Sequence, residues 1–359
     1  MNPRTLQLPW RALVLACATL TVARAAAADT PKEMMDRGQW RAVKAQAETR
    51  VKANANDAEG QWMLSRACEA FGDRDGAFAA ADKAVTLEPK NAAYQAQLAD
   101  AAGSIAQHAG PLKQLSMAKK MKKACETALE LDPKQWDARE SLMEFYLQAP
   151  GMMGGDKSKA AGLVTDAEKL DAVQGHLLAA RLARDQKDTV AVEREIRAAA
   201  AAGPNDYEAR VAMANWLAGH RQWAQAETEA KAARDLDPKR PSCDLLLTII
   251  YAAQHRTDDV EATIADYEKT FPGNRGAEYQ AARVYLTDNY DLPRAEKWLR
   301  AYVAVEPEGG QPDLAHAHWR LGQVLAAQNK KTEAKAEFET AHQLDPQMKE
   351  VKEDLKKLG

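Results

Sequence analysis

Prolines recur through most of this chain at an interval close to 34 residues. Pro204, Pro238 and Pro272 are each 34 residues apart, and Pro307 follows 35 residues later. Many of these prolines end an apolar–acidic–proline run, as in "ELDPKQ" and "DLDPKR". A fixed period of this length is typical of a solenoid that stacks helix–turn–helix units.

The residues between Pro204 and Pro238 carry the pattern of two amphipathic helices. The apolar side chains repeat at three- and four-residue spacings, which places them on one face of each helix. In the second helix the face is built mainly from alanine, at Ala226, Ala230 and Ala233. Such small side chains let paired helices approach closely, and Pro238 then ends the unit because it biases the preceding residue away from helix.

The pattern resembles the tetratricopeptide repeat (TPR). The fullest match has Leu321, Gly322, Leu325, Ala334, Phe338, Ala341 and Pro346. The resemblance implies an all-α, right-handed superhelical solenoid of antiparallel helix pairs. We expect a partial N-terminal repeat over residues 29–57, about eight repeats over residues 58–346 and a solvating cap helix over residues 347–359.

The first 28 residues have the composition of a signal peptide. Arg4 and Arg11 supply a basic start, residues 12–23 are apolar, and small residues suited to signal peptidase precede cleavage at Ala25 or Ala28. The apolar run is too short to span a bilayer. We therefore expect a periplasmic or secreted protein. A lipoprotein anchor at Cys17 is the weaker interpretation, because only five apolar residues separate it from Arg11.

Composition and spacing argue against several kinds of chemistry. The formal net charge is only −3, which does not favour nucleic acid as a partner. The three cysteines outside the leader, Cys68, Cys125 and Cys243, lack metal-ligand spacing, and Cys68 and Cys125 fall on predicted buried faces. Repeats occupy nearly all of the chain after the leader and leave no separate catalytic domain. We expect no catalytic residue, no metal and no cofactor.

The segment "APGMMGGDKSKA", residues 149–160, resembles a phosphate-binding loop only superficially. A Walker loop places glycine directly before its Lys-Ser pair and follows a strand, whereas here Asp156 precedes Lys157 and the segment follows a helix. We interpret it as a lengthened turn within a repeat, with Asp156 or Ser158 capping the next helix. Met152 and Met153 at its tip are candidates for a small contact surface.

A second departure from the period is the 44-residue interval between Pro89 and Pro133. We expect its extra residues to form an extended connection over residues 103–117.

The TPR resemblance implies that the first helix of each pair lines a concave surface. Aromatic residues and arginines anchor many protein interfaces, and we predict a partner-binding groove formed by Trp62, Arg66, Arg181, Arg184, Asn215, Tyr279, Arg283, Trp319 and Gln323. Tyr279, Arg283 and Trp319 are expected to form one continuous outward patch. The predicted partner is a protein or peptide. The alternative is a solute-binding component of a transporter, with its cleft near the glycine loop.

Overall fold

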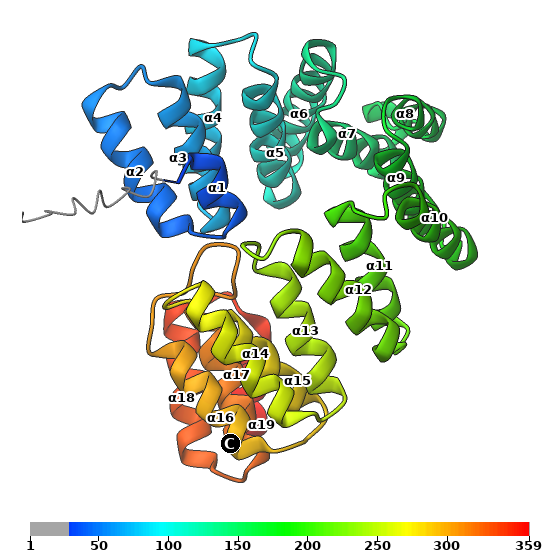
Figure 1. The fold of residues 1–359 in the computed structure, drawn as a ribbon. Helices are drawn as coiled ribbons and strands as arrows, with labels where there is room; N and C mark the ends of the chain where they lie inside the picture. The colour runs from blue at the N-terminus through cyan, green and yellow to red at the C-terminus, as the bar shows by residue number, and fades with distance from the viewer. Residues whose placement is uncertain (1–28, 359) are drawn as a thin grey trace, which may run out of the picture.

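The computed structural model describes residues 29–358, which are all-α (Figure 1). Its helices are α1 (Pro31–Asp36), α2 (Trp40–Ala53), α3 (Ala58–Ala70), α4 (Arg74–Leu87), α5 (Ala92–His108), α6 (Pro111–Leu131), α7 (Trp136–Gln148), the 3-10 turn η1 (Gly151–Met153), α8 (Lys157–Leu170), α9 (Ala172–Asp185), α10 (Thr189–Ala202), α11 (Tyr207–Gly219), α12 (Trp223–Leu236), α13 (Ser242–Ala253), α14 (Thr257–Thr270), α15 (Gly276–Thr287), α16 (Leu292–Val303), α17 (Leu314–Ala327), α18 (Lys331–Leu344) and α19 (Lys349–Leu358).

Helices α3 to α18 form eight consecutive antiparallel pairs, and the pairs stack into a curved solenoid (Figure 1). The predicted fold class, an all-α solenoid of helix pairs, is confirmed. No helix in residues 29–358 combines the length and apolar character needed to cross a bilayer. The predicted signal peptide and Cys17 lie outside the described residues.

Aspartates fix where many of these helices begin. Asp206 accepts a hydrogen bond from the Ala209 amide at 2.9 Å, and Asp313 accepts one from the His316 amide at 2.8 Å. Each carboxylate satisfies a backbone donor that has no partner within the helix. The same carboxylate lies near the positive end of the helix dipole, which adds to the stabilisation. These caps therefore set the start of α11 and α17.

The turn inside most pairs shares one backbone feature. The second residue after the first helix lies in the left-handed region and reverses the chain into the second helix. These residues and their φ angles are Gly72 (+75°), Lys187 (+59°), Arg221 (+57°), His255 (+56°), Asn289 (+51°) and Asn329 (+61°). Only one of the six is glycine, so the solenoid tolerates strained residues at this point of the turn.

Small side chains fill the space between paired helices, as predicted. Ala226, Ala230 and Ala233 are fully buried on α12. The apolar core divides into two large clusters, one running from α3 to α9 and the other from α9 to α19. They meet on α9, where Leu178 belongs to the first cluster and Ala180 to the second. Cys68 and Cys125 are buried, also as predicted.

The long interval between Pro89 and Pro133 does not form the predicted extended connection. Its extra residues lengthen both helices of the pair instead, so that α5 has 17 residues and α6 has 21. The chain breaks only at Ala109 and Gly110, and Pro111 starts α6 at a position where its missing N–H is harmless. At the N-terminus, Gly38 adopts a φ of +66° in the turn between α1 and α2.

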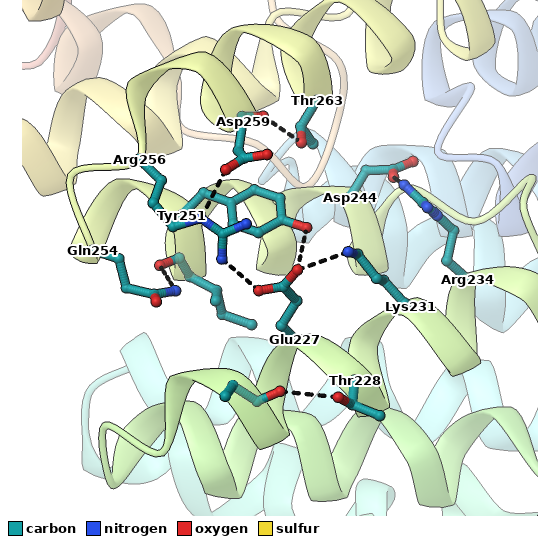
Figure 2. A network of polar contacts seen from close by, with 12 residues as sticks. Glu227, Thr228, Lys231, Arg234, Asp244, Tyr251, Gln254, Arg256, Asp259 and Thr263 are labelled. Carbon is teal, nitrogen blue, oxygen red and sulfur yellow. Dashed lines mark hydrogen bonds and ion pairs between the residues drawn. The ribbon is translucent and has the colours of Figure 1, made fainter.

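A polar network joins α12 to the turn that begins α14 (Figure 2). Glu227 accepts hydrogen bonds from Arg256 at 2.6 Å, Lys231 at 2.7 Å and the Tyr251 hydroxyl at 3.1 Å. Burial alone would raise the pKa of Glu227, but the hydrogen bonds from Arg256 and Lys231 outweigh it and lower the pKa to about 2. The charged form of Glu227 therefore stabilises this junction between pairs.

The two ends of the solenoid meet. Residues 304–313, which connect α16 to α17, reach across to α2 and α3 (Figure 1). The Gly310 amide donates a hydrogen bond to the Ala70 carbonyl at 2.7 Å, and Arg41 forms an ion pair with Glu308 at 3.2 Å. The solenoid is therefore closed into a ring rather than left as an open arc.

Candidate binding groove

Three adjoining cavities follow the first helices from α3 to α11. The first, of about 420 Å³, lies between α2, α3, α5 and α7. The second, of about 330 Å³, lies between α7, α9 and α11, and the third, of about 570 Å³, lies between α9 and α11. Asp137 and Glu140 line both the first and the second, while Leu177, Arg181 and Glu208 line both the second and the third. The cavities therefore form one continuous surface, which we call the inner groove.

The first cavity is acidic. Glu69, Asp100 and Asp137 line it, and none of the three forms an ion pair with another described residue. Ser141 donates a hydrogen bond to Asp100 at 2.9 Å. Burial and the neighbouring charge of Glu69 together raise the pKa of Asp100 to about 7. This end of the groove therefore holds a carboxyl group whose charge changes near neutral pH.

Glutamine and arginine side chains fix the position of Glu69. Gln97 donates a hydrogen bond to Glu69 at 2.8 Å and another to Ser65 at 3.0 Å. Arg66 donates to the amide oxygen of Gln97 at 3.3 Å. The wall formed by α3 and α5 is thus held by hydrogen bonds between side chains rather than by apolar packing alone.

Charges are matched in the middle of the groove. Arg181 on α9 forms an ion pair with Glu140 on α7. Burial raises the pKa of Glu140, and the charge of Arg181 opposes that rise. Because both side chains also line the cavity, the pair contributes to the groove surface as well as to the contact between neighbouring repeats.

The third cavity combines an apolar floor with free polar groups. Leu177 and Val211 contribute to the floor. Arg184 and Asn215 are exposed at its edge, and Arg184 forms no ion pair with any described residue. At its far end Trp216 and His220 have ring centroids 3.9 Å apart. Asn215 donates a hydrogen bond to the Val211 carbonyl at 2.9 Å, whereas Arg184 forms none with a described residue, so this end of the groove offers apolar surface and the free donors of Arg184.

Four of the predicted groove residues line the inner groove, namely Arg66, Arg181, Arg184 and Asn215. Trp62 does not line its cavities. Its ring packs against Tyr94, with centroids 6.1 Å apart, and it lies against the apolar clusters at the N-terminal end. Its half-buried position is explained by packing between neighbouring helices.

Tyr279 is not on an open surface, so the prediction that it faces outward is wrong. Its exposed fraction is 5%, and its ring lies 5.0 Å from that of Tyr302 on α16. The packing of α15 against its neighbours turns this position into the core. Arg283, one turn further on, is half-buried and donates a hydrogen bond to Gln280 of the same helix at 3.1 Å.

Trp319 and Gln323 face the cap helix of the same chain. Both side chains donate hydrogen bonds to Asp354 on α19, each at 2.9 Å. Arg320 also lies over the Trp319 ring, 4.2 Å from its centroid. The predicted open patch of Tyr279, Arg283 and Trp319 is therefore not present, because one member is buried and another is covered by α19.

The glycine loop is a connection between α7 and α8. Asp156 accepts hydrogen bonds from the amides of Ser158 at 2.9 Å and Lys159 at 3.2 Å, which confirms the predicted cap. Met152 is 96% exposed and Met153 is half-buried. Neither methionine lines the inner groove, so the solute-binding alternative, which depended on a cleft near this loop, receives no support from the groove.

Several residues that line the groove were not predicted from the sequence. Trp40 and Gly310 line the first cavity although neither belongs to a first helix, and Asp100 on α5 also lines it. One signal was present, because the interval from Pro307 to Pro346 is 39 residues, five more than the common period.

Within residues 29–358 no group of three or more His, Cys, Asp or Glu side chains is arranged to hold a metal ion.

Comparison with known proteins identifies one repeat directly. Residues 315–348 match the tetratricopeptide repeat family. No curated protein matches the sequence. The pair formed by α17 and α18 is thus a tetratricopeptide repeat, and the preceding pairs share its helix–turn–helix architecture.

Solved structures of other proteins show a distant similarity. Yeast Tom70 is 14% identical, with 91% of this chain and 86% of that chain covered and a TM-score of 0.48. PilW, a type IV pilus biogenesis factor, is 19% identical over 62% of this chain and 99% of its own, with a TM-score of 0.46. A tetratricopeptide repeat protein from Parabacteroides merdae is 15% identical over 84% of this chain and 98% of its own, with a TM-score of 0.43.

Proposed function

We propose that this protein is a scaffold that binds a protein or peptide partner along the inner groove. The observation that carries the proposal is the continuity of the groove across five successive first helices, from α3 to α11. Stacked repeats create extended surfaces of this kind, and such surfaces suit an extended polypeptide better than a compact small molecule.

The third cavity has the chemistry that a peptide partner requires. Leu177 and Val211 can bury apolar side chains, while Arg184 and Asn215 can donate hydrogen bonds to backbone carbonyls or carboxylates. Arginine at such a position is a frequent source of binding energy. Because Arg184 forms no ion pair with another described residue, a partner would not have to break one to reach it.

Site-specific photocrosslinking in living cells tests the proposal. A photoreactive amino acid at Val211, in the groove, is expected to give a discrete protein adduct. The same amino acid at Val190, which is exposed on α10 and does not line the groove, is the matched control and is expected to give none. Equal adducts from both positions, or none from Val211, would contradict binding in the groove.

Substitution of the arginine provides a second test. We expect Arg184→Ala to lower the affinity for the partner identified by crosslinking by about tenfold. This change corresponds to the loss of one anchoring side chain. Arg197→Ala is the control, because Arg197 is an exposed arginine on α10 that pairs with Glu193 away from the groove. Its affinity for the partner is expected to stay at the wild-type level.

We also infer that the protein acts outside the cytoplasm, because residues 1–28 have the composition of a cleavable signal peptide. N-terminal sequencing of the exported protein is expected to find Ala26 or Asp29 as the first residue. An intact Met1 on the exported protein, or a lipid on Cys17, would contradict this inference.

A further inference from the structure

The closure of the ring depends on an insertion in the repeat pattern. Residues 304–313, here called the strap, connect α16 to α17 and are twice as long as the connection between α14 and α15, residues 271–275. A connection of the usual length would lead directly from one pair to the next. The extra residues instead carry the chain to the opposite end of the solenoid (Figure 1).

Glycine is required where the strap touches α2 and α3. A Cβ atom on Gly309 would lie 2.8 Å from the Cβ of Ala70 and 2.9 Å from the Cβ of Trp40. Gly310 adopts a φ of +77°, and its amide donates the hydrogen bond to Ala70. Gly309 therefore allows a close approach that a larger residue would prevent, and Gly310 allows a left-handed backbone that other residues rarely adopt.

An ion pair with α2 also holds the strap in place. Glu308 accepts a hydrogen bond from the Arg41 amide at 3.0 Å and forms an ion pair with the Arg41 side chain at 3.2 Å. The Glu308 side chain is only 14% exposed, so solvent screens this pair less than a surface pair. Elsewhere along the junction, Pro241 lies beside Gly38.

The two ends do not share an apolar core. At the N-terminal end Met35, Val43, Ala47, Met63 and Ala67 form one cluster, while the large C-terminal cluster contains none of them. The strap is therefore attached by hydrogen bonds, an ion pair and one close packing contact. Contacts of this kind can break while each end keeps its own folded core.

The strap also contributes Gly310 to the lining of the groove. Gly310 and Trp40 line the first cavity together with Ser141, Asp100 and Glu69. We propose that the strap is a gate, which closes the ring over this cavity when it is docked and opens the cavity when it is released. A partner segment would enter this end of the groove through the open gate; only that last step rests on the proposed function.

Hydrogen exchange at a single amide reports whether the gate is docked. The Gly310 amide is expected to be protected in the wild type, because it donates to Ala70. Arg41→Glu and Glu308→Arg place like charges together, and each is expected to speed exchange at Gly310 by more than about tenfold. The double variant R41E/E308R restores opposite charges and is expected to recover most of the protection.

Access to the cavity is measured with a bulky reagent. We introduce Ser141→Cys inside the first cavity and measure its reaction with a polyethylene glycol maleimide. Opening the gate with Arg41→Glu is expected to speed this reaction by more than about tenfold. Ala336→Cys, exposed on α18, is the matched control and is expected to react equally in both backgrounds. Within residues 29–358 the wild-type cysteines are Cys68, Cys125 and Cys243, which are buried and give the background rate.

Both experiments test the gate in the absence of a partner. Rapid exchange of the Gly310 amide in the wild type would show that the strap is not docked. Release of Gly310 by Arg41→Glu with no change in labelling of Cys at position 141 would show that the strap does not control the cavity. If Arg41→Glu lowers the helix content, Glu308→Gln replaces it, because this substitution removes the charge without changing the shape. A missing partner would contradict only the proposed function.

Discussion

The indole Nε1 of Trp319 donates a hydrogen bond to Asp354 at 2.9 Å, and this contact ties α17 to the last helix of the chain. Gln323 donates to the same carboxylate from the next turn of α17. Burial would raise the pKa of Asp354, but the hydrogen bonds from Lys357, Trp319 and Gln323 lower it. An aromatic residue that the sequence suggested as an anchor for a partner therefore anchors the solenoid's own cap.

Asp354→Ala is expected to lower the free energy of unfolding by about 1–2 kcal/mol, because it leaves the Trp319 and Gln323 donors without their acceptor. Chemical denaturation followed by circular dichroism measures the change. Glu353→Ala, which removes an exposed carboxylate from the same helix, is the control and is expected to have almost no effect. Equal losses from both variants would show that the contact with α17 is not what holds α19.

Glu227→Gln is expected to lower the free energy of unfolding by about 2–3 kcal/mol near pH 7, because it removes the charge that Arg256 and Lys231 surround. The pKa of Glu227 is about 2 in the folded protein, below its ordinary value of 4.5. Its stabilising contribution is therefore complete above pH 4.5 and is lost as the pH falls toward 2.

Denaturation at several pH values checks this dependence on Glu227. The difference in the free energy of unfolding between the wild type and Glu227→Gln is expected to decrease as the pH falls below about 4. The control is Glu193→Gln, which removes one partner of the exposed ion pair with Arg197 and is expected to cost less than about 1 kcal/mol. A difference in the free energy of unfolding that stays constant with pH would contradict the lowered pKa of Glu227.

Asp100→Asn is expected to change the free energy of unfolding in the opposite sense to Glu227→Gln, with its effect appearing at high pH. The pKa of Asp100 is raised to about 7 in the folded protein from an ordinary value of 3.8, so folding favours the protonated form. The wild type therefore loses stability as the pH rises through this range, and the asparagine variant does not. Above about pH 8 we expect the variant to be more stable by about 1–3 kcal/mol, a range reduced because Asp100 keeps some contact with water.

The same two proteins should have nearly equal stability near pH 4, because Asp100 is then uncharged in the fold. Urea denaturation at the two pH values gives the comparison. Asparagine keeps an oxygen that can accept the hydrogen bond from Ser141, so the change isolates the charge. An asparagine variant that is less stable at high pH would mean that Asp100 is held as a carboxylate.

Gly155→Ala is expected to destabilise the turn between α7 and α8 by more than about 1 kcal/mol. A Cβ atom at this position would lie 1.8 Å from the Ala149 carbonyl oxygen, which forces the backbone to move. Gly151→Ala in the same loop is the matched control, because nothing lies within 4 Å of its added Cβ. Thermal denaturation of the two variants measures the difference, and equal melting temperatures would show that the loop relaxes freely.

The architecture was predictable because the information that defines it is local. Proline spacing marks the length of each pair, and the alanine face of α12 marks where helices approach closely. The interval between Pro89 and Pro133 was misinterpreted for a physical reason. Extra residues can lengthen two helices as easily as they extend a loop, and the period does not distinguish these outcomes.

The candidate site was only partly predictable because its boundaries depend on distant parts of the chain. Arg181 and Arg184 lie where the register of α9 placed them. The pattern of a single helix does not reveal which of its faces a neighbour covers, and so Tyr279 and Trp319 were misplaced. The contact between Arg41 and Glu308 spans 267 residues and has no local signature in the sequence.

The place of α9 between the two apolar clusters has a consequence for how the molecule unfolds. In a solenoid, cooperativity is transmitted from each repeat to the next. Leu178 and Ala180 are two residues apart and belong to different clusters, so the halves of the molecule are coupled through this one helix along the chain. The ring contact supplies a second route between the same halves. If both routes were weakened, the protein would behave as two tethered units with separate melting temperatures rather than as a single cooperative body.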